Sequence, residues 1–163
     1  MARKFSEPEP QTDIDVIRSM LTSDLSEVLD IELRSYGYPW SERIFIDCMS
    51  AGYYCRVVER NDVVRAYGIM SVGAGEAHML NLCADPDYRR TGLARQLLGY
   101  LIRLARSQGA DTMYLEVRPS NIAAINLYQS MGFNEIHIRP DYYPAPDGRE
   151  DALVLGRDLT FMA

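Results

Sequence analysis

The sequence predicts one α/β (α+β) domain in which a mixed sheet of about seven strands is flanked by about four helices. Three observations lead to this fold class. The chain has 163 residues, close to the usual size of one globular domain. Hydrophobic residues make up 47% and charged residues 25%, an ordinary composition for a soluble protein. Strand-like and helix-like hydrophobic patterns alternate along the chain, which is typical of a sheet covered by helices.

The first elements are expected to be a strand and two helices. The apolar stretch from Ile14 to Met20 is the candidate strand. Thr22 or Ser23 is the expected N-cap of the first helix, and Ser41 is that of the second, which Gly52 ends. The first helix carries apolar residues at helical spacing, namely Leu25, Val28, Leu29, Ile31 and Leu33.

Three strands in two hairpins are predicted next. The candidate strands run from Tyr53 to Glu59, from Val63 to Val72 and from Glu76 to Ala84. A short polar turn separates the first pair and a glycine-containing turn separates the second, so antiparallel pairing is expected in both.

The second half of the chain alternates between helix and strand. A long helix is predicted to end at Gly109, followed by a strand from Thr112 to Val117 and a helix from Ile122 to Met131. Two final strands, Phe133 to Arg139 and Asp151 to Leu159, are expected to flank a loop that contains proline and glycine. The apolar stripe of the long helix consists of Leu93, Leu97, Leu98, Leu101 and Leu104.

Composition and charge exclude several classes of function. A net charge of −6 disfavours a nucleic-acid surface and favours a basic partner. The three cysteines form no CxxC pair and the two histidines lie far apart, so neither a disulfide framework nor a metal site is predicted. Residues 1–12 are expected to be a flexible tail before a domain that spans 13–163, without a secretory signal or a membrane span. These features indicate a cytoplasmic protein that is a monomer or a weak dimer.

A turn at the start of the long helix combines positive charge with glycine. Arg89, Arg90 and Arg95 surround Gly92 and the small Ala94. Amide groups at a helix N-terminus bind phosphate, and a glycine lets the ligand approach the backbone closely. A phosphate site is therefore predicted, although the glycine could instead only ease a tight turn while the arginines are solvated. The Walker pattern is absent, and the segment GAGEAH lacks the third glycine of a dinucleotide fingerprint.

The turn and three other segments resemble one enzyme family. RRTGLA, residues 89–94, matches the pyrophosphate-binding pattern of the GCN5-related N-acetyltransferases (GNAT), which reads Arg or Gln, two residues, Gly, one residue, Gly or Ala. The resemblance extends over nearly the whole chain after the tail, narrows to the bacterial ribosomal-protein-alanine N-acetyltransferases, and implies a mostly antiparallel sheet. The segments that carry it are YPWSE (38–42), ADPDYRRTGLARQLL (84–98), LEVRPSNIAAINLYQSMGF (115–133) and YYPAPDGREDALVL (142–155).

The resemblance implies acetyl-CoA as cosubstrate and the N-terminal alanine of a small-subunit ribosomal protein as acceptor. Glu116 would be the general base, Tyr128 the general acid, and Asn121 a contact to the cofactor. Ala94 stands where a second glycine is common in the family. The other implied cofactor contacts are the backbone of Leu82, Cys83 and Ala84 and the turn residues Arg90, Thr91, Gly92, Leu93, Ala94 and Arg95.

Glu116 and Tyr128 also stand out from their positions alone. Glu116 shares one face of its strand with Arg118, where it is a candidate base. A salt bridge to Arg118 or Arg139 is the alternative role for this carboxylate. Tyr128 lies two helical turns after Asn121 and points toward the same region, with an ordinary core tyrosine as the alternative.

A carboxylate base suits an N-terminal amine as acceptor. The pKa of a free α-amine is about 7.7–8.0 and that of lysine about 10.4, so deprotonation near pH 7 costs about 1 kcal/mol for the α-amine and about 4–5 for lysine. A backbone N–H near Cys83 or Ala84, at an irregularity of the strand, is expected to stabilise the oxyanion. The Cys83 thiol itself is predicted to be a packing group rather than a nucleophile.

Aromatic residues are expected to form the acceptor site, because rigid rings can position a chain end. Trp40 could instead only seat the second helix. Two other functions stay open: acetyl transfer to lysine or a small amine, and a non-catalytic acyl-CoA-binding sensor, against which the presence of both Glu116 and Tyr128 speaks. The expected acceptor residues are Tyr38, Trp40, Tyr142 and Tyr143.

Overall fold

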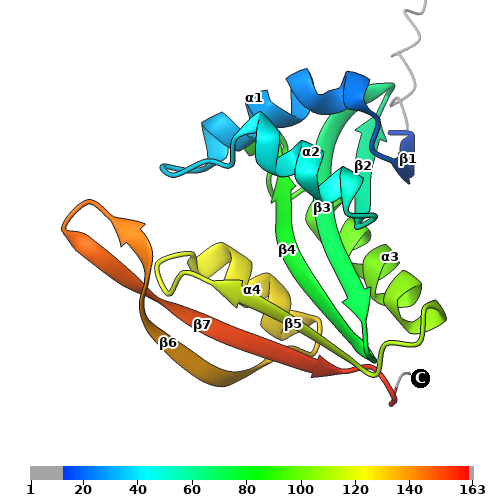
Figure 1. The fold of residues 1–163 in the computed structure, drawn as a ribbon. Coiled ribbons are helices and arrows are strands. Elements are labelled where there is room, and N and C mark those ends of the chain that lie inside the picture. Colours follow the sequence, from blue (N-terminus) through cyan, green and yellow to red (C-terminus); the bar gives the residue numbers. More distant parts are fainter. Residues whose placement is uncertain (1–12, 162–163) are drawn as a thin grey trace, which may run out of the picture.

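The computed structural model describes residues 13–161, and the predicted tail, residues 1–12, lies outside the described residues. A seven-stranded mixed sheet runs through the molecule in the order β1-β2-β3-β4-β5-β7-β6 (Figure 1). This sheet, with its covering helices, confirms the predicted fold class. The strands are β1 Asp15–Ser19, β2 Tyr54–Arg60, β3 Val63–Gly73, β4 Glu76–Ala84, β5 Thr112–Val117, β6 Asn134–Ala145 and β7 Gly148–Asp158.

The helices pack on the sheet in two groups. They are α1 Leu25–Ser35, α2 Glu42–Ser50, α3 Leu93–Ser107 and α4 Ile122–Ser130. Helices α1 and α2 share a core cluster with Val57 and Tyr67, and Figure 1 shows them side by side over β2, β3 and β4. Helix α3 packs in a second cluster with Met70 and Leu115, which continues to Tyr128 of α4. The sheet therefore separates the α1–α2 group from the α3–α4 group.

Helix α3 lies very close to β3 at Gly68. A Cβ atom on Gly68 would be 2.9 Å from Leu101 Cδ1 and 3.3 Å from Leu97 Cδ2. The predicted apolar stripe of α3 is buried at Leu97, Leu98 and Leu101, whereas Leu104 is only half-buried. This close packing determines where the start of α3, and with it the arginine-rich turn, lies relative to the sheet.

Strands β4 and β5 are parallel neighbours that separate part-way along β4. Their pairing covers only Glu76–Met79 of β4 and Thr112–Leu115 of β5. Beyond Met79, β4 stays paired with β3 on one side, and on the other side no strand of residues 13–161 pairs with it. Backbone polar groups on that open side are therefore available to a ligand.

The C-terminal hairpin is longer than predicted. Strand β6 extends to Ala145 and β7 begins at Gly148, so the expected loop is reduced to Pro146 and Asp147. The prediction was wrong because prolines were read as loop residues. Strand β6 is at the edge of the sheet, where Pro140 and Pro144 can be accommodated, and a register shift between β6 and β7 falls in the same stretch.

The start of α1 also differs from the prediction. A 3₁₀ turn, Thr22–Asp24, precedes the helix, so neither Thr22 nor Ser23 caps it. Asp24 occupies the N-cap position, and its carboxylate accepts a hydrogen bond of 2.7 Å from the backbone N–H of Leu21. The carboxylate therefore caps the 3₁₀ turn and displaces the start of α1 along the chain.

Candidate active site

A groove of about 1080 Å³ occupies the gap between β4 and β5. Its walls come from the α1–α2 loop, the second half of β4, the start of α3, the end of β5, α4 and β6. The volume is that of a site for a large cofactor, since small-molecule sites measure about 300–1,000 Å³. The wall brings together predicted site residues from β4, β5 and α4, namely Leu82, Cys83, Ala84, Glu116, Asn121 and Tyr128.

Residues 85–92, the donor turn, connect β4 to α3, and four of them line this groove, namely Tyr88, Arg89, Arg90 and Gly92. Arg90 has a φ of 61° and Gly92 a φ of 86°, so both adopt the left-handed conformation. Successive N–H groups in such a turn form a concave anion site at the positive end of the helix dipole. A Cβ atom on Gly92 would meet nothing within 4 Å, so glycine is needed there for its φ angle rather than for space.

The side chains around the donor turn divide into two groups. Arg89, Arg90 and Arg95 line the groove and place positive charge on its wall. The Thr91 hydroxyl donates to a backbone carbonyl inside the turn at 2.6 Å, and Leu93 is 1% exposed in the core. Thr91 and Leu93 can therefore contribute to a phosphate site only through their backbone.

Strand β4 presents its backbone to the groove and keeps its thiol inside. Cys83 is buried, and burial raises the pKa of its thiol, so the prediction of a packing role is confirmed. The prediction of a strand irregularity near Cys83 or Ala84 was wrong in its position. It lies at Leu80, the extra residue where Met79 and Asn81 pair with consecutive residues of β3. Bulges of this kind often occur beside active sites, where they redirect the strand.

Glu116 lies on the groove wall near the end of β5. The odd-numbered residues of β5 are buried in the core, so Glu116 faces the opposite side. Its side chain is 28% exposed, and its Oε1 lies 3.3 Å from Nε of Arg139. The ion pair considered in the sequence analysis is thus formed with Arg139. Because exposed pairs contribute only about 0–1 kcal/mol, Arg139 orients the carboxylate without withdrawing it from the groove.

Tyr128 belongs both to the core and to the groove wall. Its ring centre lies 5.8 Å from that of Phe133 in an edge-to-face contact, and burial raises the pKa of its phenol above the usual range. Asn121 caps α4 as predicted, with its side chain accepting from the backbone N–H of Ala124 at 3.2 Å. Both residues line the groove, as their spacing indicated.

Three of the four predicted acceptor aromatics line the groove, namely Tyr38, Trp40 and Tyr143. Trp40 also packs on α2, with its ring centre 5.3 Å from that of Phe45, so the seating role holds as well. Tyr142 is not part of the groove wall. Its ring packs edge-on against that of Tyr143, with 4.9 Å between the two ring centres. A hydrogen bond to the Glu116 carboxylate raises the pKa of the Tyr142 phenol, so Tyr142 lies beside the candidate base.

Arg118 contacts aromatic residues on two walls of the groove. Its guanidinium carbon lies 5.4 Å from the ring centre of Tyr38 and 4.4 Å from that of Tyr143, and Nη1 donates to the carbonyl of Pro144 at 2.8 Å. The sequence analysis considered Arg118 only as a salt-bridge partner. Its position two residues after Glu116, on the same strand face, was the available signal.

Glu32 is a second residue that the sequence analysis missed. This buried carboxylate of α1 accepts 3.0 Å hydrogen bonds from the backbone N–H of Trp40 and from the side chain of Asn81, and a third from the Tyr67 hydroxyl. It therefore ties the α1–α2 loop to β4 beside the bulge. The sequence pattern that could have revealed its burial is its position seven residues after Leu25, on the apolar stripe of the helix.

Residues 22–133 match the model of the acetyltransferase (GNAT) family. The chain belongs to the GNAT acetyltransferase family. Enzymes of this family use acetyl-CoA as the acetyl donor, and the matched region contains β2 to β5, the donor turn, α3 and α4.

Relatives of this acetyltransferase cover almost the same length. The ribosomal protein bS18-alanine N-acetyltransferase of Escherichia coli (strain K12) is 44% identical over 147 residues, which is 90% of this chain and 99% of that protein. Its counterpart in Haemophilus influenzae is 33% identical over 144 residues, 87% of this chain and 97% of that protein. The crystal structure of the ribosomal-protein-S18-alanine N-acetyltransferase from Escherichia coli superposes with a TM-score of 0.85 at 41% identity, covering 92% of this chain and 97% of that one.

Two further structural findings concern residues 13–161. None of the helices in this range is long and apolar enough to cross a membrane. No three His, Cys, Asp or Glu side chains of the same range form a group that could hold a metal ion.

Proposed function

We propose that this acetyltransferase transfers the acetyl group of acetyl-CoA to the α-amine of an N-terminal alanine, and that its acceptor is a small-subunit ribosomal protein. The observation that carries the proposal is the groove between β4 and β5, whose wall includes the donor turn, Glu116 and Tyr128. Relatives whose names state this activity align with about nine-tenths of the chain, which supports the same acceptor class.

The donor turn fits the pyrophosphate of acetyl-CoA. Its left-handed residues, Arg90 and Gly92, leave amides free at the start of α3, and three arginines add positive charge to the same wall. Asn121 and the open backbone of residues 82–84 would hold the rest of the donor. When bound, acetyl-CoA supplies the thioester whose acetyl group is transferred.

Each reacting atom has a residue of this chain within the groove. Glu116 accepts the proton that the attacking amine loses, directly or through a water, as the N–C bond forms. A backbone N–H on the open side of β4, beyond the bulge at Leu80, stabilises the negative charge that develops on the acetyl oxygen. Tyr128 donates its proton toward the sulfur as the C–S bond breaks, and its raised pKa keeps the phenol protonated until then.

The cost of deprotonation favours an α-amine over lysine. Glu116 lies on the groove wall with its side chain 28% exposed, where its carboxylate can accept the amine proton. Deprotonation near pH 7 costs about 1 kcal/mol for an α-amine and about 4–5 kcal/mol for a lysine amine. The walls formed by Tyr38 and Tyr143 would position the chain end. The net charge of −6 suits a basic acceptor in the cytoplasm, met by an enzyme that is a monomer or a weak dimer.

Mass spectrometry of peptides tests this function. The protein is incubated with acetyl-CoA and a peptide that begins with alanine, and fragmentation locates the acetyl group. The matched control is the same peptide with a blocked N-terminus and an internal lysine. We expect one acetyl group on the alanine α-amine and none on the control. Modification of the blocked peptide would favour a lysine acetyltransferase, and acetyl-CoA binding without transfer to any amine would favour a sensor.

A further inference from the structure

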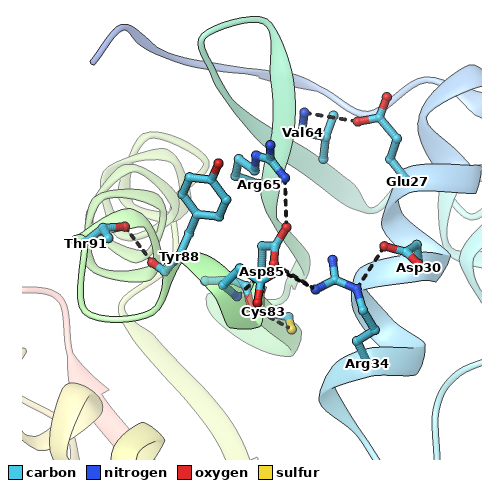
Figure 2. Close-up of polar contacts among 11 residues, drawn as sticks. Glu27, Asp30, Arg34, Val64, Arg65, Cys83, Asp85, Tyr88 and Thr91 are labelled. Carbon is cyan, nitrogen blue, oxygen red and sulfur yellow. Dashed lines mark hydrogen bonds and ion pairs between the residues drawn. The ribbon is translucent and has the colours of Figure 1, made fainter. Parts of the chain in front are cut away.

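Asp85 is a buried carboxylate at the junction of β4 and the donor turn, and Figure 2 shows it between two arginines. Its side chain is 1% exposed. Oδ1 accepts from Nη1 of Arg34 on α1 at 3.0 Å, and Oδ2 accepts from Nη1 of Arg65 on β3 at 3.1 Å. Three elements that are far apart in the sequence thus meet at one carboxylate.

The same residue organises the backbone of the donor turn. Asp85 Oδ1 accepts from the N–H of Asp87 at 3.0 Å, and the Asp85 carbonyl accepts from the N–H of Tyr88 at 2.8 Å. The guanidinium carbon of Arg65 lies 4.2 Å from the centre of the Tyr88 ring. The Thr91 hydroxyl in turn donates to the Tyr88 carbonyl at 2.6 Å (Figure 2). A continuous series of contacts therefore leads from Asp85 to the residue before the left-handed glycine.

The donor turn needs such contacts from outside to keep its shape. Arg90 adopts the left-handed conformation at φ 61°, which is strained for a residue other than glycine. Strained backbone of this kind persists only where the surroundings hold it. Asp85 supplies these contacts through Arg65 on β3 and through Arg34 near the end of α1.

We propose that Asp85 is a positioning residue for the donor: it holds the donor turn against β3 and α1 so that the amides beside Gly92 face the pyrophosphate. Asp85 is not part of the groove wall and acts through the turn. The proposal rests on the proposed use of acetyl-CoA. Loss of Asp85 should therefore weaken only those ligands that carry a pyrophosphate.

Two variants and two donors separate this role from a general effect on folding. Asp85→Asn removes the charge at nearly constant size. Asp30→Asn is the matched control, because Asp30 pairs with the same Arg34 at 2.9 Å but is 64% exposed. Isothermal titration calorimetry measures the Kd of acetyl-CoA. Kinetics with acetyl-pantetheine, which carries the thioester without a pyrophosphate, measure kcat/KM for a donor that bypasses the turn.

Asp85→Asn is expected to raise the Kd of acetyl-CoA about tenfold, as for the loss of a charge-assisted hydrogen bond, while kcat/KM with acetyl-pantetheine changes less than about twofold. Asp30→Asn should leave both values as in the wild type. An unchanged Kd in Asp85→Asn, or an equal loss with both donors, would overturn the proposal.

Arg65→Gln covers the case in which Asp85→Asn does not fold. It removes the cation over Tyr88 but leaves the Asp85–Arg34 pair, and it should raise the Kd of acetyl-CoA about threefold. An unchanged Kd there counts against the proposal as well. If the wild-type protein binds acetyl-CoA but modifies no alanine peptide, the proposed acceptor is wrong. The Kd values of the Asp85 and Asp30 variants would then still test the role of Asp85. A wild-type protein that does not bind acetyl-CoA would end both.

Discussion

At the scale of single residues, Glu116 and Tyr128 are the side chains whose loss should slow acetyl transfer most. Glu116→Gln keeps the size of the side chain but removes its basicity, so kcat should fall about 10²–10⁴-fold. Tyr128→Phe removes the proton donor and should lower kcat by at least about tenfold. Neither side chain belongs to the donor turn, so the Kd of acetyl-CoA should change less than about twofold.

Steady-state kinetics and calorimetry check this pair of variants. Glu135→Gln, at an exposed position on β6, is the control for Glu116→Gln and should match the wild type. A kcat that is unchanged in Glu116→Gln would remove this carboxylate from the mechanism, and the same holds for Tyr128→Phe.

Substitution of Glu32 should lower the stability of the fold rather than the rate of acetyl transfer. Glu32→Ala would leave the Trp40 N–H, the Asn81 amide and the Tyr67 hydroxyl without their acceptor in the interior. Buried groups without partners cost about 1–3 kcal/mol each, so the free energy of unfolding should fall by about 3–5 kcal/mol. Glu32→Gln keeps part of the acceptor and should lose less. Urea unfolding measures both, and equal losses in the two variants would contradict the hydrogen-bond account.

At the scale of elements, the contact between α3 and β3 predicts that the same substitution destabilises the protein at one position of β3 and has little effect at another. Gly68→Val should lower the free energy of unfolding by about 1–3 kcal/mol, because its side chain would collide with Leu97 and Leu101. Gly73→Val should change it by less than about 0.5 kcal/mol, because nothing lies within 4 Å of a Cβ there. Thermal or urea unfolding measures the difference. Equal effects would mean that α3 can move away from β3 freely.

At the scale of the whole molecule, paired carboxylates should make the protein sensitive to acid. The hydrogen bond from Arg34 foremost, helped by Arg65, lowers the pKa of Asp85 to about 2, and arginine partners also lower the pKa values of Asp15 and Asp24. A carboxyl group with a lowered folded-state pKa stabilises the fold fully above its unfolded pKa of about 3.9, and this stabilisation disappears as pH falls through the folded pKa.

The free energy of unfolding should therefore fall between about pH 4 and pH 2, with Asp85 alone contributing on the order of 2 kcal/mol. Urea unfolding across this pH range measures the slope. Asp85→Asn lacks the titrating group and should show a smaller fall over the same range than the wild type. Identical slopes would show that the ionised Asp85 adds no stability.

Much of the fold could be predicted, because the deciding interactions are local. Helical periodicity placed α3, strand patterns placed β2 to β5, and Ser41 and Asn121 stand at the starts of α2 and α4 as expected. The long β6–β7 hairpin could not be predicted in the same way. Whether Pro140 and Pro144 interrupt a strand depends on which strand is at the edge of the sheet, and that is settled only when all strands have assembled.

The site divides along the same line. From the sequence, local patterns placed the glycine turn at the helix start, the face of β5 that carries Glu116 and the Asn121 cap, whereas the roles of Glu116 and Tyr128 are predictions from the family resemblance. Only the tertiary structure decided which charges meet. Asp85 finds Arg34 at a separation of 51 residues and Arg65 at 20, since both contacts require β3, β4 and α1 to be packed together. The groove itself opens because β4 and β5 separate after Met79, a relation between two strands that no single segment contains.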